Sequence, residues 1–379
     1  MSPEVLVVGG GPAGAATALR LASAGRDVMM CDQSAEGLVR PGEVLRPEVR
    51  PLLEALGVWE LFLDARPRAM HGVWSAWGGA EGETEEGLLL LARDYVLNPF
   101  GTAWGIDRAR FDRLLRDACR SVGIADRCGW RAAGMRPHDS GWTVELQQGS
   151  RHLDVMTRFV VDATGRGGRM ARAAGALASR RDCLVALVGV RAAPAHAAVE
   201  EVLLLEAAPD GWWYSCYDPA GDLVVAYLTD GDLVRAAGRT PAVHWSDALR
   251  QSFWTRERTT GSAGRSFHVR PARSACLDRA AGPGWVAVGD AAGSIDPLSG
   301  AGITRALSSG LQAADAVHRA LQGDIAPLDA YASRSQASFL SAGTTGGSYY
   351  ATERRWPRSP FWQRRASMRA SASSRAQDH

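Results

Sequence analysis

Two glycine-rich segments, far apart along the chain, carry residue types that bind phosphate and accept hydrogen bonds from hydroxyl groups. The first is GGGPAG at residues 9–14, which contains the spacing G-x-G-x-x-G. The second is GDAAGSIDPLSGAGI at residues 289–303, where Asp290 follows a glycine and a glycine-rich stretch precedes a helical pattern. A helix N-terminus after a glycine turn can approach a phosphate, and a carboxylate such as that of Asp290 accepts hydrogen bonds from sugar-like hydroxyls.

The first segment has the spacing of a dinucleotide-binding loop, because it follows an apolar run at residues 4–8 and opens a helical pattern. Gly9 permits the tight turn, Gly11 lets the backbone approach a pyrophosphate, and Gly14 allows close packing of helix on strand. Asp32, at the end of the next strand, is placed to accept hydrogen bonds from ribose hydroxyls. The residues expected to hold the adenosine and pyrophosphate end are Gly9, Gly11, Pro12, Ala13, Gly14, Asp32 and Gln33.

The second segment favours FAD over NAD as the bound dinucleotide. A flavin carries a ribityl chain with free hydroxyls, and Asp290, next to the small Gly289, can accept a hydrogen bond from one of them. Backbone N–H groups at the helix entry can face the flavin ring, whose reduced form carries negative charge that a helix N-terminus stabilises. The residues expected at this end of the cofactor are Gly289, Asp290, Gly300, Ala301, Gly302 and Ile303.

The elements that must position these segments are those of a parallel sheet with helices. Residues 4–8 and 27–31 predict buried parallel strands, and residues 106–122 and 302–321 predict helices. The middle of the chain has short β-rich runs separated by turn residues, with a hairpin at residues 211–230. We therefore expect an α/β fold, in which a Rossmann-like FAD-binding domain is interrupted by an antiparallel β-rich substrate domain.

Both expected domains are discontinuous. The FAD-binding domain is predicted to comprise residues 1–66, 100–175 and 268–340, and the β-rich substrate domain to comprise residues 67–99 and 176–267. Residues 341–379 form an Arg- and Ser-rich C-terminal tail. Because this tail is poor in aliphatic residues from Glu353 onward, we expect it to be largely disordered.

Composition is that of an ordinary globular protein. Of the 379 residues, 46% are hydrophobic and 22% are charged, and the net charge is +2, so neither nucleic acid nor a membrane is indicated as a partner. The six cysteines form no C-x-x-C pair, which argues against a zinc site. The N-terminus lacks the basic region of a signal peptide, so we expect a cytoplasmic location. No lysine occurs anywhere in the chain.

Several motifs give the chain a resemblance to the FAD-dependent monooxygenase superfamily of the p-hydroxybenzoate hydroxylase type, over most of residues 4–325. They are GGGPAG (9–14), Asp32, IDRARFD (106–112), VVDATGR (160–166) and GDAAGSIDPLSGAGI (289–303). The resemblance implies that Arg40 and Glu43 lie near the flavin or its ribityl chain. It also implies that Arg108 reaches the pyrophosphate region and that Asp290 reaches the ribityl chain.

One motif departs from the pattern of many single-component hydroxylases, which have Asp-Gly where this chain has Thr164-Gly165. The variant DATGR resembles the branch that contains flavin-dependent halogenases and geranylgeranyl-type reductases. The expected electron source is therefore either NAD(P)H acting directly or a partner flavin reductase. Halogenases of this branch use a catalytic lysine and a W-x-W-x-I-P signature, and the chain has neither, which argues against halogenation by that mechanism.

Other segments look like the flavoproteins that mature tryptophylquinone cofactors, such as the lysine-oxidase and quinohemoprotein maturases. They are RPGEVLRPEVRPLLEALGVWELFL (40–63), HGVWSAWG (71–78), the N-P-x-G-x-x-W run at 98–104 and GWWYSCYDPAGDLVVAYLTD (211–230). This similarity implies hydroxylation of a tryptophan indole in a peptide or protein. The oxygen would come from O₂ through a flavin C4a-hydroperoxide.

Such a reaction needs a dry pocket with an aromatic wall. Alternation along a strand puts Trp212, Tyr214 and Cys216 on one face and Trp213 on the other, and one of these faces is expected to look toward the flavin. Two alternatives stay open: a hydroxylase or reductase of a free natural-product intermediate, and a non-catalytic FAD-binding redox sensor. The candidate pocket residues are His71, Trp74, Trp77, Trp104, Trp213, Tyr214, Asp296 and Pro297.

Overall fold

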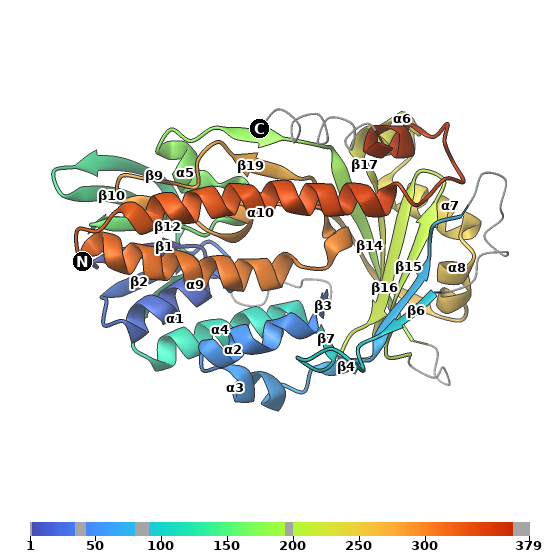
Figure 1. The fold of residues 1–379 in the computed structure, drawn as a ribbon, viewed down its shortest axis with the longest axis horizontal. Coiled ribbons are helices and arrows are strands. Elements are labelled where there is room, and N and C mark those ends of the chain that lie inside the picture. Colours follow the sequence, from blue (N-terminus) through green and yellow to red (C-terminus); the bar gives the residue numbers. More distant parts are fainter. Residues whose placement is uncertain (1, 35–42, 80–90, 194–199, 367–379) are drawn as a thin grey trace.

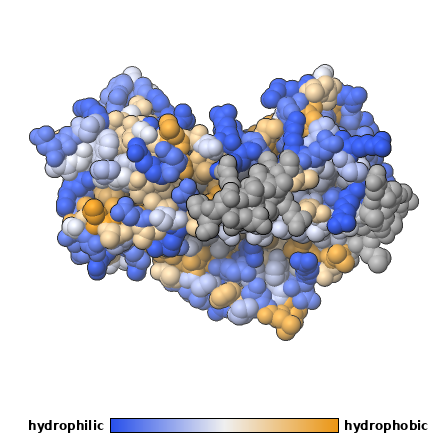
Figure 2. All heavy atoms as spheres, turned by 45° about the horizontal axis from the view of Figure 1, so that its top comes forward, coloured by the Kyte–Doolittle hydropathy of each residue, from blue (hydrophilic) through white to orange (hydrophobic). Residues whose placement is uncertain are grey.

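The computed structural model describes residues 2–34, 43–79, 91–193 and 200–366. A six-stranded sheet flanked by helices and a seven-stranded sheet beside it organise these residues (Figure 1). The expected fold class, a Rossmann-like part combined with a β-rich part, is confirmed. Figure 2 shows a mostly hydrophilic face whose upper outline is notched between the two parts. Within the described ranges, no helix has both the length and the apolar character needed to cross a bilayer.

The six-stranded sheet has the order β20-β21-β12-β1-β2-β8, and all neighbours except β20 and β21 are parallel. Its central strand is a short apolar run in which Val5, Leu6 and Val7 are completely buried. Strands covered on both faces are typical of parallel sheets. The strands are β1 (Val5–Val8), β2 (Val28–Asp32), β8 (Ala125–Cys128), β12 (Phe159–Asp162), β20 (Ala281–Gly282) and β21 (Trp285–Ala287).

Helices cover this sheet, and the helices expected at residues 106–122 and 302–321 are confirmed as α4 and α9. Asp107 caps α4, because its side chain accepts a hydrogen bond of 3.0 Å from the Arg110 N–H. The long α10 runs beside α9 (Figure 1). The helices of this part are α1 (Pro12–Ser23), α2 (Arg50–Ala55), α3 (Trp59–Asp64), α4 (Arg108–Ser121), α5 (Arg169–Ala173), α9 (Gly302–Leu321) and α10 (Ala326–Tyr350).

The seven-stranded sheet has the order β18-β14-β17-β16-β15-β5-β6. Its neighbours are antiparallel except for β5 and β15, which are parallel, so the expected antiparallel pairing is wrong for that pair alone. The predicted hairpin at 211–230 is confirmed as β16 and β17. The strands are β5 (Gly72–Ala76), β6 (Leu91–Asp94), β14 (Leu184–Ala192), β15 (Val202–Ala208), β16 (Gly211–Tyr217), β17 (Asp222–Asp230) and β18 (Ala263–Pro271).

The two faces of this sheet contact different layers, because side chains alternate along each strand. The inner face, which carries Trp212, Tyr214 and Cys216, packs against the end of α10 and the chain that follows it. The outer face carries Trp213, which is covered by α7. The helices of this part are α6 (Gly231–Ala236), α7 (Pro241–Gln251) and α8 (Trp254–Thr259).

Three small sheets complete the described fold. In the sheet β3-β7-β4, β4 and β7 follow the predicted domain boundaries near residues 66 and 100. Its strands are β3 (Glu43–Leu45), β4 (Arg68–Met70) and β7 (Ala103–Ile106). The other two consist of β9 (Arg131–His138), β10 (Gly141–Gln148) and β11 (Arg151–Thr157), and of β13 (Ala178–Arg180), β19 (Ala275–Leu277) and β22 (Gly293–Ser294).

The C-terminal segment, which we define as residues 353–366, is folded against the inner face of the seven-stranded sheet. The expectation of a largely disordered tail from Glu353 is therefore wrong for these residues. Phe361 is completely buried and Trp362 is 6% exposed, and both rings contact the ring of Tyr350. α10 also continues to Tyr350, past the predicted start of the tail at residue 341. Aromatic burial supplies the stabilisation that aliphatic residues do not.

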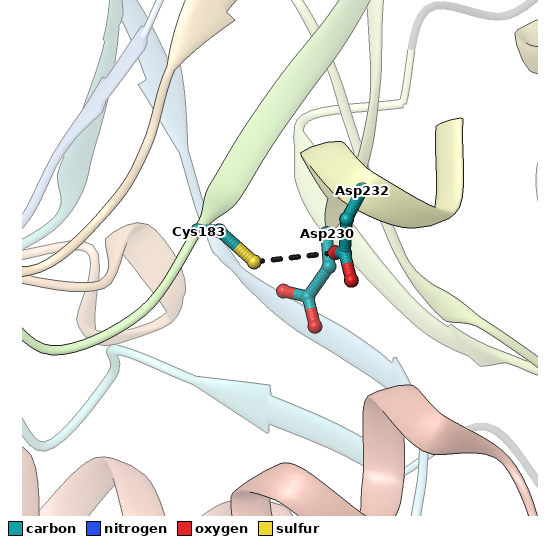
Figure 3. A group of neighbouring side chains, drawn as sticks. All are labelled: Cys183, Asp230 and Asp232. Carbon is teal, nitrogen blue, oxygen red and sulfur yellow. Dashed lines mark hydrogen bonds between the residues drawn. The ribbon is translucent and has the colours of Figure 1, made fainter. Parts of the chain in front are cut away.

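Ion pairs fix the end of this segment to the sheet. Cys183, Asp230 and Asp232 lie together, and the Cys183 thiol donates to Asp232 at 3.3 Å (Figure 3). Arg364 pairs with Asp232 at 2.6 Å and with Asp230 at 2.8 Å, and Arg365 pairs with Asp230 at 2.9 Å. Two guanidinium groups thus neutralise the acids, so this group of side chains anchors the C-terminal segment.

Candidate functional site

The loop after β1 has the geometry that a dinucleotide requires. A Cβ at Gly9 would lie 2.1 Å from the carbonyl oxygen of Ala163, and a Cβ at Gly14 would lie 1.9 Å from that of Gly9. Both positions therefore need glycine for packing. Gly11 instead faces open space, and no side chain caps the first turn of α1. Uncapped N–H groups with an open approach fit a pyrophosphate at this helix end.

Asp32 ends β2 beside this loop. One carboxylate oxygen accepts a hydrogen bond from the Gly10 N–H at 2.5 Å, and the other accepts one from the Ser34 N–H at 2.6 Å. These bonds orient the carboxylate and leave further lone pairs free. Asp32 can therefore still accept hydrogen bonds from ribose hydroxyls, and the exposed Gln33 lies next to it.

The two glycine-rich segments lie in contact, as one long cofactor across both would require. Gly289 has a φ of 57°, and a Cβ there would lie 2.8 Å from the Cβ of Ala13 and 3.4 Å from that of Ala306. The Gly289 N–H donates to Ser309 Oγ of α9 at 2.9 Å. α1, α9 and the chain after β21 thus converge at a position where only glycine fits.

The entry to α9 is open at Gly302 and has no side-chain cap. Gly300 has a φ of 60° and ends a turn in which its N–H donates to the Pro297 carbonyl at 2.8 Å. A Cβ at Gly302 would meet no atom within 4 Å, while Ile303 anchors the helix in the core. No side chain caps α9, with Ala301 as its N-cap residue. Its first N–H groups are therefore available to a negatively charged ring edge.

Arg108 and Glu43, which the family resemblance brings toward the cofactor, are paired with each other. Arg108 Nη1 lies 2.8 Å from Glu43 Oε1, and Arg108 Nε lies 2.8 Å from Asp112 Oδ1. Burial opposes the charge, but the two carboxylates raise the pKa of Arg108 above its usual value. Arg108 is therefore a fixed cation near the first turn of α4.

Asp290 is held more loosely than Arg108. Its Oδ2 lies 3.4 Å from Arg166 Nε, and 37% of its side chain is exposed. The carboxylate is thus available to a ribityl hydroxyl. Arg40, the remaining residue that the resemblance placed near the flavin, lies outside the described residues.

A buried hydrogen-bond chain, which was not predicted from the sequence, joins the two parts of the molecule. Trp212 Nε1 on the inner face donates to the Tyr350 hydroxyl at 2.8 Å, and this hydroxyl donates to Asp296 Oδ2 at 2.8 Å. The Leu298 N–H also donates to Asp296 Oδ1 at 2.9 Å, across Pro297. Burial raises the pKa of Asp296. The residue that completes the chain, Tyr350, lies at the end of α10 in the predicted tail region.

We expect Tyr350→Phe to lower the free energy of unfolding by about 1–3 kcal/mol, because it leaves the buried Trp212 N–H without an acceptor. The change also removes a donor from Asp296, so the pKa of that carboxyl rises further. A carboxyl whose pKa is raised by folding favours the folded state at low pH, and this stabilisation is lost as the pH rises through the pKa. Urea unfolding should therefore show a larger loss at neutral than at mildly acidic pH.

Tyr349→Phe is the matched control for this prediction. Its hydroxyl bonds only to Ser75 Oγ at 2.9 Å among the described residues, in a partly exposed site. We expect a loss of at most about 1 kcal/mol with no pH dependence of this kind. Equal losses for the two variants would contradict a special role of the chain through Tyr350.

Several of the predicted pocket residues do not meet. Trp213 lies on the outer face, completely buried and stacked on Tyr227, so it cannot belong to a pocket on the inner face. Trp104 of β7 packs against Trp59 and Phe62 in the core of the first part. The sequence pattern left open which way each side chain points. The direction found in the structure places both residues outside a common pocket.

The other predicted aromatic and histidine residues also separate. His71 lies on the surface with 65% of its side chain exposed, where its Nε2 is 2.8 Å from Glu201 Oε2. Trp74 pairs opposite Leu204 and shares the outer side of the sheet. Trp77 is buried on the inner face and contacts the C-terminal segment. The exposed His71 therefore does not line a pocket with the buried aromatic residues.

Tyr214 and Cys216 are the predicted aromatic-strand residues that face the first part of the molecule. The Tyr214 hydroxyl lies 3.2 Å from Cys216 Sγ, in one apolar cluster with Val44 of β3 and Leu298. Burial raises the pKa of Tyr214 well above its usual value and that of Cys216 to about 11. Both groups are therefore neutral near neutral pH. They form an uncharged wall beside the turn that carries Asp296 and the entry to α9.

The nucleotide-binding loop contacts Gly289 in the second glycine-rich segment, and this segment continues to the uncapped N-terminus of α9. Such an arrangement fits a flavin dinucleotide. Residues 2–339 match the model of the FAD binding domain family, and the chain belongs to this family. It is thus an FAD-dependent oxidoreductase, as the resemblance of its motifs implied.

Three similar proteins are described as enzymes of different kinds. LodB of Marinomonas mediterranea, described as an FAD-dependent oxidoreductase, is 28% identical over 96% of this chain and 97% of its own. A tryptophan 2-halogenase of Chondromyces crocatus is 26% identical over 95% of this chain and 70% of its own. The solved structure of QhpG, a peptidyl tryptophan dihydroxylase essential for tryptophylquinone cofactor biogenesis, has a TM-score of 0.73 and 25% identity. It covers 97% of this chain, which covers 79% of QhpG.

Proposed function

We propose that this protein is an FAD-dependent monooxygenase that hydroxylates the indole ring of a tryptophan in a peptide or protein. The observation that carries this proposal is the similarity to the peptidyl tryptophan dihydroxylase QhpG, which extends over 97% of the chain. The similarity includes both the nucleotide-binding part and the inner face of the seven-stranded sheet.

The residues have separable roles in this proposal. The first turn of α1, with Gly11, holds the pyrophosphate, while Asp32 and Asp290 accept hydrogen bonds from the ribose and ribityl hydroxyls. Reduced FAD supplies the chemistry that activates O₂. The open N-terminus of α9 stabilises negative charge on the ring edge that faces it. Electrons come from NAD(P)H directly or from a partner flavin reductase.

The wall that would meet the substrate suits an indole. Tyr214 and Cys216 are neutral, and Val44 and Leu298 are apolar, so these four side chains offer no ionised base. The carboxylate of Glu43, which acts on both Tyr214 and Cys216, is paired with Arg108. An indole needs none, because its ring nitrogen supplies electron density to the carbon that is attacked. The C-terminal segment covers the inner face beyond Trp212 and excludes water from that side.

The test uses flavin-loaded protein, reduced chemically, mixed with O₂ and a tryptophan-containing peptide. Mass spectrometry should show the addition of one or more oxygen atoms to this peptide and none to the same peptide with phenylalanine in place of tryptophan. Repeating the reaction with NADH, NADPH or a flavin reductase identifies the electron source. Gly11→Ala protein, which we expect to lack flavin, is the matched control.

The outcomes separate the alternatives. Oxygen addition to free indoles but not to peptides would instead support a hydroxylase of natural-product intermediates. Reoxidation of the flavin without any change in either substrate class would contradict both and favour a redox sensor.

Halogenation is a second candidate because of the tryptophan 2-halogenase relative. The absence of lysine from the chain argues against it, and bromide in the reaction should leave the product masses unchanged.

A further inference from the structure

An open pocket of about 240 Å³ lies between α9 and α10. We call it the α9–α10 pocket. Its wall carries two arginines and several hydroxyl groups: Arg305, Ser308, Ser309, Tyr331, Arg334 and Ser338. These six residues have no role in the function proposed above, whereas Gly289, Asp290 and Gly302, which also line the pocket, belong to the expected flavin site.

Arg305 is a cation without a partner in the part of the chain that the structure describes. Its side chain forms no hydrogen bond or ion pair there, and burial lowers its pKa. The acid that attracts it, Asp290, lies instead within ion-pair distance of Arg166. The neighbouring Thr304 hydroxyl, which also lines the pocket, is buried without a hydrogen-bond partner. A half-buried cation and a buried hydroxyl left in this way are costly unless a ligand satisfies them.

A second guanidinium faces the same pocket from the opposite helix. Arg334 of α10 bonds through Nε to Gln312 Oε1 at 3.4 Å, a long contact to a neutral group. Asp290 is the one acid on the pocket wall. Two arginines outnumber it, so the pocket favours an anion.

The pocket wall is rigid where it meets the sheet. The Tyr331 hydroxyl donates to the Ala287 carbonyl at 2.8 Å and lies 2.8 Å from Ser309 Oγ. Ser309 Oγ in turn accepts the Gly289 N–H. Gly289 lines the pocket and also contacts Ala13 of α1. The pocket wall is held in place by these hydrogen bonds, and its described lining includes no residue of the loop at 9–14.

We propose that the α9–α10 pocket binds a phosphate group through Arg305 and Arg334. Guanidinium groups present pairs of N–H donors that match phosphate oxygens, and the serines add neutral donors. A volume of about 240 Å³ is below the range of about 300–1,000 Å³ typical of pockets that hold whole small molecules. The ligand is therefore inorganic phosphate or the phosphate end of a larger molecule, such as the 2′-phosphate of NADPH.

Calorimetric titration of the flavin-loaded protein tests this site. Inorganic phosphate, 2′,5′-ADP, NADPH and NADH are titrated separately into wild-type protein and into Arg305→Gln and Arg334→Gln. We expect saturable one-site binding of at least one phosphate probe, weakened about tenfold or more by Arg305→Gln, since charged hydrogen bonds of this kind are lost. An unchanged flavin absorption spectrum and thermal midpoint show that each variant is folded.

The matched control is Arg319→Gln at the other end of α9, where Arg319 pairs with Asp324 on the surface at 3.0 Å. Its affinity for phosphate should stay within about twofold of wild type. Binding of phosphate alone identifies a free oxyanion as the ligand, whereas binding of 2′,5′-ADP and NADPH but not NADH identifies the coenzyme. No saturable binding of any phosphate probe to wild type, or equal binding by Arg305→Gln, would overturn the proposal.

Discussion

Gly11→Ala is expected to produce a folded protein that has lost most of its affinity for FAD. The backbone of Gly11, with φ of −77° and ψ of −177°, is one that alanine adopts freely, and its Cβ would meet no protein atom within 4 Å. The added methyl group instead occupies the space through which a pyrophosphate approaches α1. Crowding of about 1–3 kcal/mol weakens binding by about 5- to 150-fold. Titration of flavin-free protein, followed by flavin fluorescence, measures the effect.

Gly14→Ala gives the contrasting result. Because a Cβ at Gly14 would lie 1.9 Å from the Gly9 carbonyl oxygen, this change should lower the thermal midpoint of the flavin-free protein as well as its affinity for FAD. Gly11→Ala should leave that midpoint unchanged. A Gly11→Ala protein that retains wild-type affinity would show that the pyrophosphate does not approach α1 at this residue.

Phe361→Ala is expected to lower the free energy of unfolding by about 3–5 kcal/mol. Phe361 is completely buried between Tyr350, Trp362 and the guanidinium group of Arg365, so truncation leaves a cavity where the C-terminal segment meets the sheet. Urea unfolding followed by tryptophan fluorescence measures the change. The variant also tests whether the C-terminal segment is part of the folded core.

Leu340→Ala is the control for the second prediction. Leu340 lies on α10 and is 53% exposed, so its truncation should change the free energy of unfolding by no more than about 0.5 kcal/mol. Phe361→Leu keeps most of the volume and should fall between the two. Equal unfolding midpoints for Phe361→Ala and wild type would mean that the C-terminal segment does not pack on the inner face.

The nucleotide-binding half could be predicted because its signals are local. Strand, glycine turn, helix and Asp32 follow one another within a short stretch, and each residue type has one geometric reason to be there. The sequence also predicted that one long cofactor spans both glycine-rich segments, but it did not predict the direct contact between Ala13 and Gly289. Glycines at these positions are explained by the close approaches that the structure shows.

The substrate side could not be predicted to the same depth, because it depends on which way side chains point after distant segments pack. Alternation correctly separated Tyr214 from Trp213, but could not say which of them faces the first part of the molecule. Trp104 was expected in a pocket and lies in a core. The C-terminal segment was mistaken for a solvated tail because arginine and serine dominate it, although Phe361 and Trp362 are the residues that decide its position.

The parallel pairing of β5 with β15 has a consequence for synthesis of the protein on the ribosome. β5 is made more than a hundred residues before its partner, since Gly72 pairs with Val202 and Ala76 with Glu206. Until β15 emerges, the early strand presents an unpaired edge that is open to other nascent chains. We expect chaperones that cover such edges to raise the yield of native enzyme, and ribosome-bound intermediates that end before residue 202 to aggregate most readily.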